Sequence, residues 1–513
     1  MSSPALPPKS SPFPPEMTLW VIFALAKLGT HLLSAQGYGI FRDEFYFIDC
    51  GKHLDFGYVD HPPMVAVSAW VSHTLFGDSI LGLRLFPALA GAFKMLMVGW
   101  LTREIGGGRM AQALACLAFL VTPIFMAVDS MLTIVTYEHL FWLGACCILA
   151  RIISTENQKL WLLFGLCAGL AMLTKYSFAY LAAATLLGLL LTPQRKLLWS
   201  KSILGAGALA LILFLPNLIW QIRHDWATFA FLSTVHQYDH SRISFLEFTL
   251  GQILYHHPLL FPLWLAGLGY FFLTPKGKPY RLFGWSFVFT YLFFLFMQGK
   301  IYYLSPVYPA LFAGGAILLE SGIQRLGRLW LGWLTGFVIL TGGMVLAPIF
   351  LPILPFPLYR AYVGHFTRQL PNAHELDQLF IDRLGWEEQV SQIAQIFQTL
   401  PRDEQRRCMI LATDYGEAGA LNYYGKQYGL PTAVSGHNSY FFWGPGETTL
   451  ETVIVYGQGL DEEEVYQCWE EVQLVTHLKT NPGPPWEQNL PVYLCRKPKL
   501  SMQDFWPLTR KGF

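Results

Sequence analysis

The chain contains a series of apolar segments long enough to cross a lipid bilayer as helices, and this restricts its fold more than any other feature. Segments 17–36, 111–126, 203–221 and 329–351 can each span a hydrocarbon core of roughly 30 Å. Only 13% of the residues are charged, where a soluble domain has about 25%. This composition argues against a soluble enzyme and predicts a polytopic α-helical membrane protein.

The apolar pattern predicts about eleven membrane spans. They lie at about 17–36, 82–101, 111–128, 131–150, 160–174, 177–192, 203–221, 250–272, 282–298, 303–321 and 329–350. An odd number places the two termini on opposite sides of the membrane. The loops on the amino-terminal side hold twice as many lysines and arginines as the opposite loops. The positive-inside rule therefore places the amino terminus in the cytoplasm. We expect a multi-pass protein of the plasma (inner) membrane.

Acidic residues divide the chain into a membrane part and a water-exposed part. Of the 34 acidic residues, 19 follow residue 354. We therefore expect a disordered cytoplasmic amino terminus at 1–16, a transmembrane domain at 17–354 with outer loops at 37–81 and 222–249, and an extracytoplasmic soluble α/β domain at 355–513. In this last domain, helices are predicted at 386–400 and 461–469, and short buried strands at 408–413, 452–456 and 492–495.

Reactive side chains are concentrated on one predicted side of the membrane. Ten acids and eight histidines of the transmembrane domain fall on the outer side, whereas the cytoplasmic loops are short, basic and nearly free of histidine. Any chemistry is therefore expected at the outer face. The net charge of +1 gives no indication of a nucleic-acid partner.

The first outer loop holds the most informative motif. It reads Gly-Tyr-Gly-Ile-Phe-Arg-Asp-Glu-Phe-Tyr at 37–46. Two carboxylates beside an arginine are costly to hold near lipid unless they face a polar cavity or a partner. A charge cluster in which Arg42 pairs with Asp43 or Glu44 explains the local sequence equally well.

Four motifs together resemble a known family. They are Arg-Asp-Glu at 42–44, Asp-His-Pro-Pro at 60–63, Leu-Thr-Lys-Tyr at 173–176 and Lys-Ile-Tyr-Tyr-Leu-Ser-Pro-Val-Tyr-Pro at 300–309. Over about residues 15–350 the chain is similar to bacterial members of the dolichyl-phosphate-mannose-protein mannosyltransferase superfamily, in the group that contains the aminoarabinose transferase of lipid A. The resemblance implies a GT-C fold and an outer-face active site.

The resemblance also implies the reaction. It indicates an inverting glycosyltransferase that moves a sugar from polyprenyl phosphate to an envelope lipid, glycan or protein, without a nucleotide cofactor. Asp43 matches the family's catalytic aspartate and is expected to act as general base. Glu44 is adjacent, so its side chain diverges from that of Asp43, and we assign it a supporting or metal-facing role in catalysis.

The departing phosphate needs positive charge. Lys175 and Lys300 lie at outer ends of apolar spans within the family-like motifs and are the first candidates. An isolated lysine in this position more often reaches to the lipid headgroups. Weaker candidates for the same role are Arg42, His61 and Arg223.

Aromatic and metal-ligating candidates complete the predicted site. Tyr302, Tyr303 and Tyr58 are expected to line the sugar or acceptor pocket, although an aromatic belt at the membrane interface explains such tyrosines nearly as well. Asp60 occupies the position of a metal-binding glutamate in the aminoarabinose transferases, whereas His61 replaces their lysine. Asp60 with His256 or His257 could hold a divalent metal. Two interfacial histidines that cap a helix are an equally good interpretation.

Two other functions fit part of the pattern. A transporter or flippase of a lipid-linked or small polar substrate would place ionisable groups near the bilayer midplane and on both gates. Here these groups cluster at one surface, which favours the enzyme. A third interpretation is a non-enzymatic assembly factor whose carboxy-terminal domain binds envelope partners.

Overall fold

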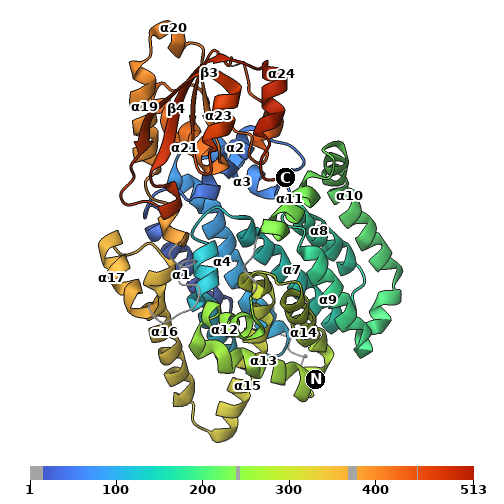
Figure 1. Ribbon diagram of the computed structural model, residues 1–513. Coiled ribbons are helices and arrows are strands. Elements are labelled where there is room, and N and C mark those ends of the chain that lie inside the picture. The colour runs from blue at the N-terminus through green and yellow to red at the C-terminus, as the bar shows by residue number, and fades with distance from the viewer. Residues whose placement is uncertain (1–15, 239–242, 368–377, 448) are drawn as a thin grey trace, which may run out of the picture.

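The computed structural model describes residues 16–238, 243–367, 378–447 and 449–513. Within them a bundle of helices is capped at one end by a smaller α/β domain, residues 386–513 (Figure 1). The expected disorder of 1–16 falls almost entirely outside the described residues, and so does part of the predicted loop 222–249.

Long apolar helices form the frame of the bundle. They are α1 (Met17–Ser34), α4 (Ile80–Glu104), α7 (Ile134–Thr155), α10 (Lys201–Arg223), α15 (Tyr308–Leu326) and α16 (Trp330–Phe350). Shorter helices fill the space between them: α5 (Arg109–Val121), α6 (Pro123–Val128), α8 (Leu160–Met172), α9 (Phe178–Leu190), α12 (Phe245–Tyr255), α13 (Phe261–Leu273) and α14 (Arg281–Phe296). At the end that faces the α/β domain lie α2 (Arg42–Lys52), α3 (Met64–Phe76), α11 (Ala227–Tyr238) and α17 (Phe356–Thr367) (Figure 1). The 3₁₀ helix η4 (Ile301–Val307) directly precedes α15.

The predicted number of eleven spans is not confirmed. Among the described residues, six helices are long and apolar enough to cross a membrane, or seven if Pro258–Leu273 and Lys278–Phe296, bent by 102°, form one span. Prolines explain part of the difference. The predicted span 111–128 breaks at Pro123, and the predicted span 250–272 breaks before Pro258.

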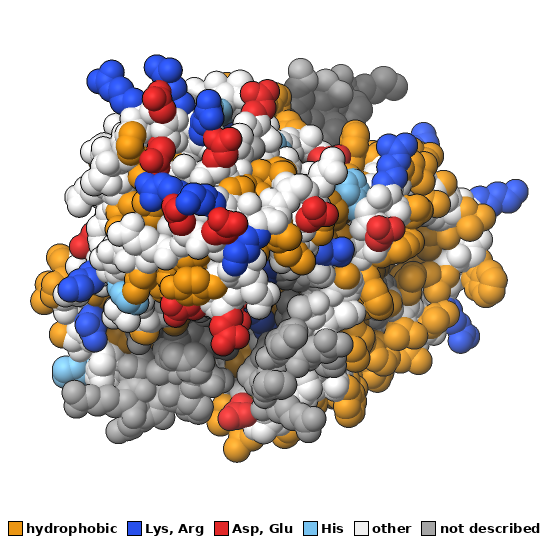
Figure 2. Space-filling view, turned by 45° about the horizontal axis from the view of Figure 1, so that its top comes forward, with side chains coloured by type: hydrophobic (Ala, Val, Ile, Leu, Met, Phe, Trp, Pro, Cys, Tyr) orange, Lys and Arg blue, Asp and Glu red, His pale blue; other side chains and the backbone are white. Residues whose placement is uncertain are grey.

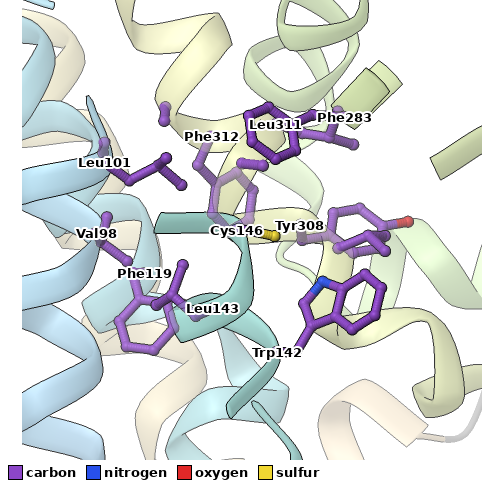
Figure 3. Close-up of a cluster of buried hydrophobic side chains, with 14 of the residues drawn as sticks. Val98, Leu101, Phe119, Trp142, Leu143, Cys146, Phe283, Tyr308, Leu311 and Phe312 are labelled. Atoms are coloured by element: carbon purple, nitrogen blue, oxygen red, sulfur yellow. The ribbon is translucent and has the colours of Figure 1, made fainter. Parts of the chain in front are cut away.

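The centre of the bundle is an apolar core built around α15 (Figure 3). Tyr308, Leu311 and Phe312 of α15 pack in one cluster with Phe119 of α5 and Trp142 of α7. The outward faces of α10 and α16 expose large apolar side chains, among them Leu204 and Trp333. Apolar side chains cover much of the flank beside the α/β domain, whereas charged side chains gather on that domain (Figure 2). Helices that are apolar inside and outside are typical of a bundle surrounded by lipid.

Two lysines in the middle of apolar helices share one buried acid. Lys27 of α1 lies 2.9 Å from Asp129, and Lys94 of α4 lies 2.5 Å from the other oxygen of the same carboxylate. All three side chains are buried. Charges inside an apolar bundle are tolerated when they are paired. The shared pairing with Asp129 therefore explains why two lysines occur inside apolar helices.

The α/β domain contains a four-stranded mixed sheet. Its strands are β1 (Cys408–Ala412), β2 (Thr452–Tyr456), β3 (Trp469–Leu478) and β4 (Leu490–Pro498), in the order β1-β2-β4-β3. β1 and β2 are parallel, and β4 is antiparallel to both β2 and β3. The three predicted strands are confirmed. β3 was not predicted, because most of its residues are exposed and it lacks a buried apolar run.

Helices cover both faces of this sheet. α19 (Trp386–Thr399) and α21 (Tyr415–Tyr424) pack on the face directed toward the bundle, and α23 (Glu462–Cys468) and α24 (Met502–Phe505) pack on the other. The core on the inner face is continuous with side chains of α2 and α3. The α/β domain is therefore packed directly on the loop that carries the Arg-Asp-Glu motif.

Candidate active site

Asp43 lies in the first turn of α2, at the junction between the bundle and the α/β domain. Its Oδ1 accepts a hydrogen bond of 2.7 Å from the hydroxyl of Tyr415 in α21. Its Oδ2 accepts none from a described residue and is not enclosed. Burial raises the pKa of Asp43; the hydrogen bond from Tyr415 and the charge of Arg42 oppose this shift. Oδ2 of Asp43 is therefore available, and it belongs to a carboxylate whose pKa is raised.

Glu44, next in sequence, has a different environment. It is fully buried, and Nε and Nη2 of Arg84 donate hydrogen bonds of 3.0 and 2.5 Å to its two oxygens. The backbone amides of Phe41 and Leu132 also donate to it, each at 2.9 Å. Burial pushes the pKa of Glu44 upward, but Arg84 outweighs this effect and the pKa is lowered. With its oxygens occupied, Glu44 stabilises the start of α2, and the expected catalytic role does not fit this geometry.

Arg42 pairs with a residue of the α/β domain. Its guanidinium forms a bidentate ion pair with Asp414, in which Nε lies 3.1 Å from Oδ1, and it stacks over the ring of Tyr415 at 4.8 Å. The alternative of a local pair between Arg42 and its neighbours Asp43 or Glu44 is therefore wrong. The bidentate pair and the stacking hold Arg42 in the contact between the bundle and the α/β domain.

Lys175 lies in a polar cluster with the predicted tyrosines. Its Nζ is 2.9 Å from Oε2 of Glu138 and lies over the rings of Tyr303 and Tyr302 at 4.5 and 5.5 Å. Tyr302 also interacts electrostatically with both Glu138 and Asp43. The structure thus brings Lys175, Tyr302 and Tyr303 to the same region as Asp43.

Asp60 joins this region from the other side of the first outer loop. Its Oδ1 accepts a hydrogen bond of 2.9 Å from the hydroxyl of Tyr46, and its charge acts on Asp43. Asp60 is partly exposed. The two carboxylates Asp43 and Asp60 therefore lie near each other.

His61 and Tyr58 are buried beneath the loop. The two rings stack at 4.8 Å, and His61 Nδ1 donates to the carbonyl of Pro62 at 2.8 Å. The hydroxyl of Tyr58 lies 2.9 Å from the carbonyl of Cys50. Both side chains are about 1% exposed, which is too little to bind a phosphate or line a sugar pocket. Their prediction as ligand-binding residues is corrected to a structural role.

The predicted metal site is not assembled. His256 is buried in the bundle, where it stacks on Tyr308 at 3.4 Å and its Nδ1 donates to the carbonyl of Gln252. His257 accepts a hydrogen bond from the amide of Leu259. No group of three or more histidines, cysteines or acids in the described part of the chain is arranged to hold a metal ion. These histidines shape the break between α12 and α13 and do not join Asp60.

The remaining two basic candidates lie at the periphery. The side chains of Lys300 and Arg223 are exposed and form no ion pair with a described residue. Lys300 directly precedes η4, which carries Tyr302 and Tyr303, whereas Arg223 ends α10.

Sequence analysis missed three residues of this region. Glu138 is an acid inside an apolar segment, and Arg84 is a base at the start of one. Such positions are rarely occupied without a function or a partner, so both carried a usable signal. Tyr415 carried none, because its contact with Asp43 joins residues far apart in the chain.

Chemically, the region offers an available carboxylate oxygen, a lysine and aromatic rings, the groups needed for a hydroxyl to displace a phosphate.

Comparisons with known proteins relate part of the sequence to glycosyltransferases. A family model described as dolichyl-phosphate-mannose-protein mannosyltransferase matches residues 60–220. A lipid A galacturonosyltransferase of Rhizobium johnstonii is 26% identical over 261 residues, which are 48% of this chain and 53% of that protein. The chain thus spans about half the length of that curated relative.

The fold is shared with solved structures along almost the whole chain. ArnT from Cupriavidus metallidurans in the apo state has a TM-score of 0.61 at 17% identity, with 93% of this chain and 98% of that chain covered. ArnT bound to undecaprenyl phosphate has a TM-score of 0.57 at 16% identity, with 92% and 97% covered. The fold implied by the resemblance of the four motifs is therefore confirmed.

Proposed function

We propose that this protein is an inverting membrane glycosyltransferase that moves a sugar from a polyprenyl-phosphate donor to an envelope lipid, glycan or protein. The observation that carries the proposal is Asp43. Its Oδ1 is held by Tyr415, its Oδ2 is available, and burial raises its pKa. This fits a general base, whose pKa should approach the working pH. The shared fold with ArnT and the similarity to a lipid A galacturonosyltransferase support the same reaction class.

In the proposed reaction, Oδ2 of Asp43 removes the proton of the acceptor hydroxyl. The hydroxyl oxygen forms a bond to the anomeric carbon while the bond between that carbon and the phosphate oxygen breaks, which inverts the configuration. Lys175 stabilises the negative charge on the departing polyprenyl phosphate. Tyr302 and Tyr303, which lie beside Lys175, contact the sugar. ArnT bound to undecaprenyl phosphate supports a donor of this lipid class.

We further propose that the chain is a multi-pass protein of the plasma (inner) membrane with the α/β domain outside the cytoplasm. The six or seven long apolar helices support membrane insertion. The twofold excess of basic residues that the predicted eleven-span arrangement places in the loops on the amino-terminal side supports this orientation. In this arrangement Asp43 and Lys175 face the outer leaflet, where a sugar on polyprenyl phosphate would meet an envelope acceptor.

The proposal is tested by mass spectrometry of envelope lipids, glycans and glycoproteins from cells with and without the gene. The expected result is a sugar mass that disappears on deletion and returns with the wild-type gene, together with release of polyprenyl phosphate by the purified protein. An unmodified lipid-linked precursor that accumulates on the inner leaflet, without transferase activity in the purified protein, would instead show a flippase.

Lys175→Met is expected to weaken use of the donor. Loss of a charged hydrogen bond to phosphate should raise the KM for polyprenyl-phosphate sugar roughly 10- to 100-fold, measured with purified protein in lipid nanodiscs. Lys426→Met is the matched control. Lys426 also pairs with an acid, Asp78, at 2.8 Å, as Lys175 pairs with Glu138, but the Lys426–Asp78 pair lies on the exposed surface. An unchanged KM in Lys175→Met would remove Lys175 from the phosphate site.

A further inference from the structure

Helix α21 of the α/β domain packs against α2. Gly416 and Gly419 face α2 so closely that an added Cβ would lie 2.4 Å from Cγ of Arg42 and 2.7 Å from Cβ of Phe45. Asp414 caps the start of α21 by accepting a hydrogen bond of 2.7 Å from the amide of Gly416. The same carboxylate pairs with Arg42. The first turns of α21 and α2 are thus fixed against each other.

This contact places Tyr415 directly on the proposed base. We infer that Tyr415 is a positioning residue for Asp43, so that the α/β domain supplies part of the catalytic machinery. The inference rests on the proposed function, because it assumes that Asp43 accepts the proton of the acceptor hydroxyl. The hydroxyl of Tyr415 donates to Oδ1 and leaves Oδ2 as the oxygen that can act.

The ring of Tyr415 is held on several sides, which makes it suitable for this role. Arg42 stacks over it at 4.8 Å, and the rings of Tyr46 and His437 lie 5.2 and 5.1 Å away. His437 in turn lies 3.0 Å from the carboxylate of Asp414. A side chain fixed in this way can hold one carboxylate oxygen without loss of further conformational freedom at each turnover.

The hydrogen bond also affects the proton affinity of Asp43. Burial and the charges of Asp60 and Asp414 raise the pKa of Asp43, whereas Tyr415 and Arg42 lower it. Tyr302 and Asp382 interact electrostatically with Asp43 from η4 and from the segment before α19. Without the hydroxyl of Tyr415, the pKa of Asp43 should rise. Because a general base must be unprotonated, the acidic limb of the pH–rate profile should then move to higher pH.

A second tyrosine provides a matched control. The hydroxyl of Tyr440, also from the α/β domain, donates to Oδ2 of Asp49 at 2.5 Å. Asp49 lies on α2 as well but is buried and also bound by Lys52 and Asn422. Tyr415→Phe and Tyr440→Phe therefore each remove one hydroxyl-to-carboxylate bond between the same domain and the same helix, and only the first bond reaches the proposed base.

The test is the pH dependence of kcat/KM for purified wild type, Tyr415→Phe and Tyr440→Phe, with polyprenyl-phosphate sugar as donor. We expect the acidic limb of Tyr415→Phe to move up by about one pH unit, with the KM for donor changed less than twofold. Tyr440→Phe should keep the wild-type limb. Thermal unfolding of the two variants, which should be similar, measures any loss of domain docking.

Two results would overturn the inference. One is a wild-type pH profile in Tyr415→Phe, and the other is an equal shift in both variants, which would indicate docking alone. Failure of the proposed function is a separate result, because it would appear as absence of sugar transfer by the wild-type protein or as full activity of Asp43→Asn.

Discussion

Asp43→Asn is expected to reduce kcat roughly 10²- to 10⁴-fold, the usual contribution of a general base. Asparagine keeps the size of the side chain and still accepts a hydrogen bond from Tyr415 through its amide oxygen, so the junction between α2 and α21 should persist. It has no basicity near neutral pH, and the acceptor hydroxyl would have to attack with its proton still bound. The measurement is single-turnover transfer by purified protein, because this isolates the chemical step from product release.

Asp78→Asn is the control for this experiment. Asp78 lies in the same outer loop but is partly exposed and pairs with Lys426 on the surface. Its substitution should leave kcat within about twofold of wild type, since exposed ion pairs contribute little. If Asp43→Asn retained more than a tenth of wild-type kcat with a normal thermal unfolding curve, the assignment of Asp43 as base would be incorrect.

Glu44→Gln is expected to reduce the amount of folded protein, with a loss of roughly 3–5 kcal/mol in the free energy of unfolding. The substitution leaves the buried guanidinium of Arg84 without its counter-charge. The amides of Phe41 and Leu132 and the guanidinium of Arg84 all donate to the two oxygens of Glu44. Glutamine replaces one of these acceptor oxygens by an NH₂ group, which is itself a donor and cannot accept their hydrogen bonds. Thermal unfolding in detergent, followed by fluorescence or by retention on size exclusion, measures this loss.

Glu247→Gln provides the comparison for Glu44→Gln. Glu247 caps the start of α12 in a similar way, because its carboxylate accepts from the amide of Ser244 at 2.8 Å, but it forms no ion pair with a described residue and is solvent-accessible. Its substitution should change the melting temperature only slightly. If Glu44→Gln instead unfolded like wild type and lost transfer activity as Asp43→Asn does, Glu44 would be catalytic, as the sequence first indicated.

The adjacent acids of the Arg-Asp-Glu motif show how far local sequence can be interpreted. Successive residues of a helix are about 100° apart, so the expected divergence of Asp43 and Glu44 follows from their adjacency alone. Which acid faces the reaction depends on Arg84 and Tyr415, which are 40 and 372 positions away from their partners. The motif thus indicated acid chemistry at this loop, while the assignment of each acid required the packed structure.

Patterns of apolarity and charge were sufficient to predict a helical membrane protein, the buried strands β1, β2 and β4, and the outer loop that carries Asp43. Burial in lipid or in a sheet imposes a regular spacing of apolar residues along the sequence, and this spacing can be recognised locally. They were insufficient for the number of spans, the burial of His61, Tyr58 and His256, and the partner of Arg42. The burial of His256 and the partner of Arg42 each depend on a contact between distant segments. The free energy of such a contact depends on which side chains exclude water from one another. These side chains come from two different segments, so the sequence of one segment does not reveal the contact.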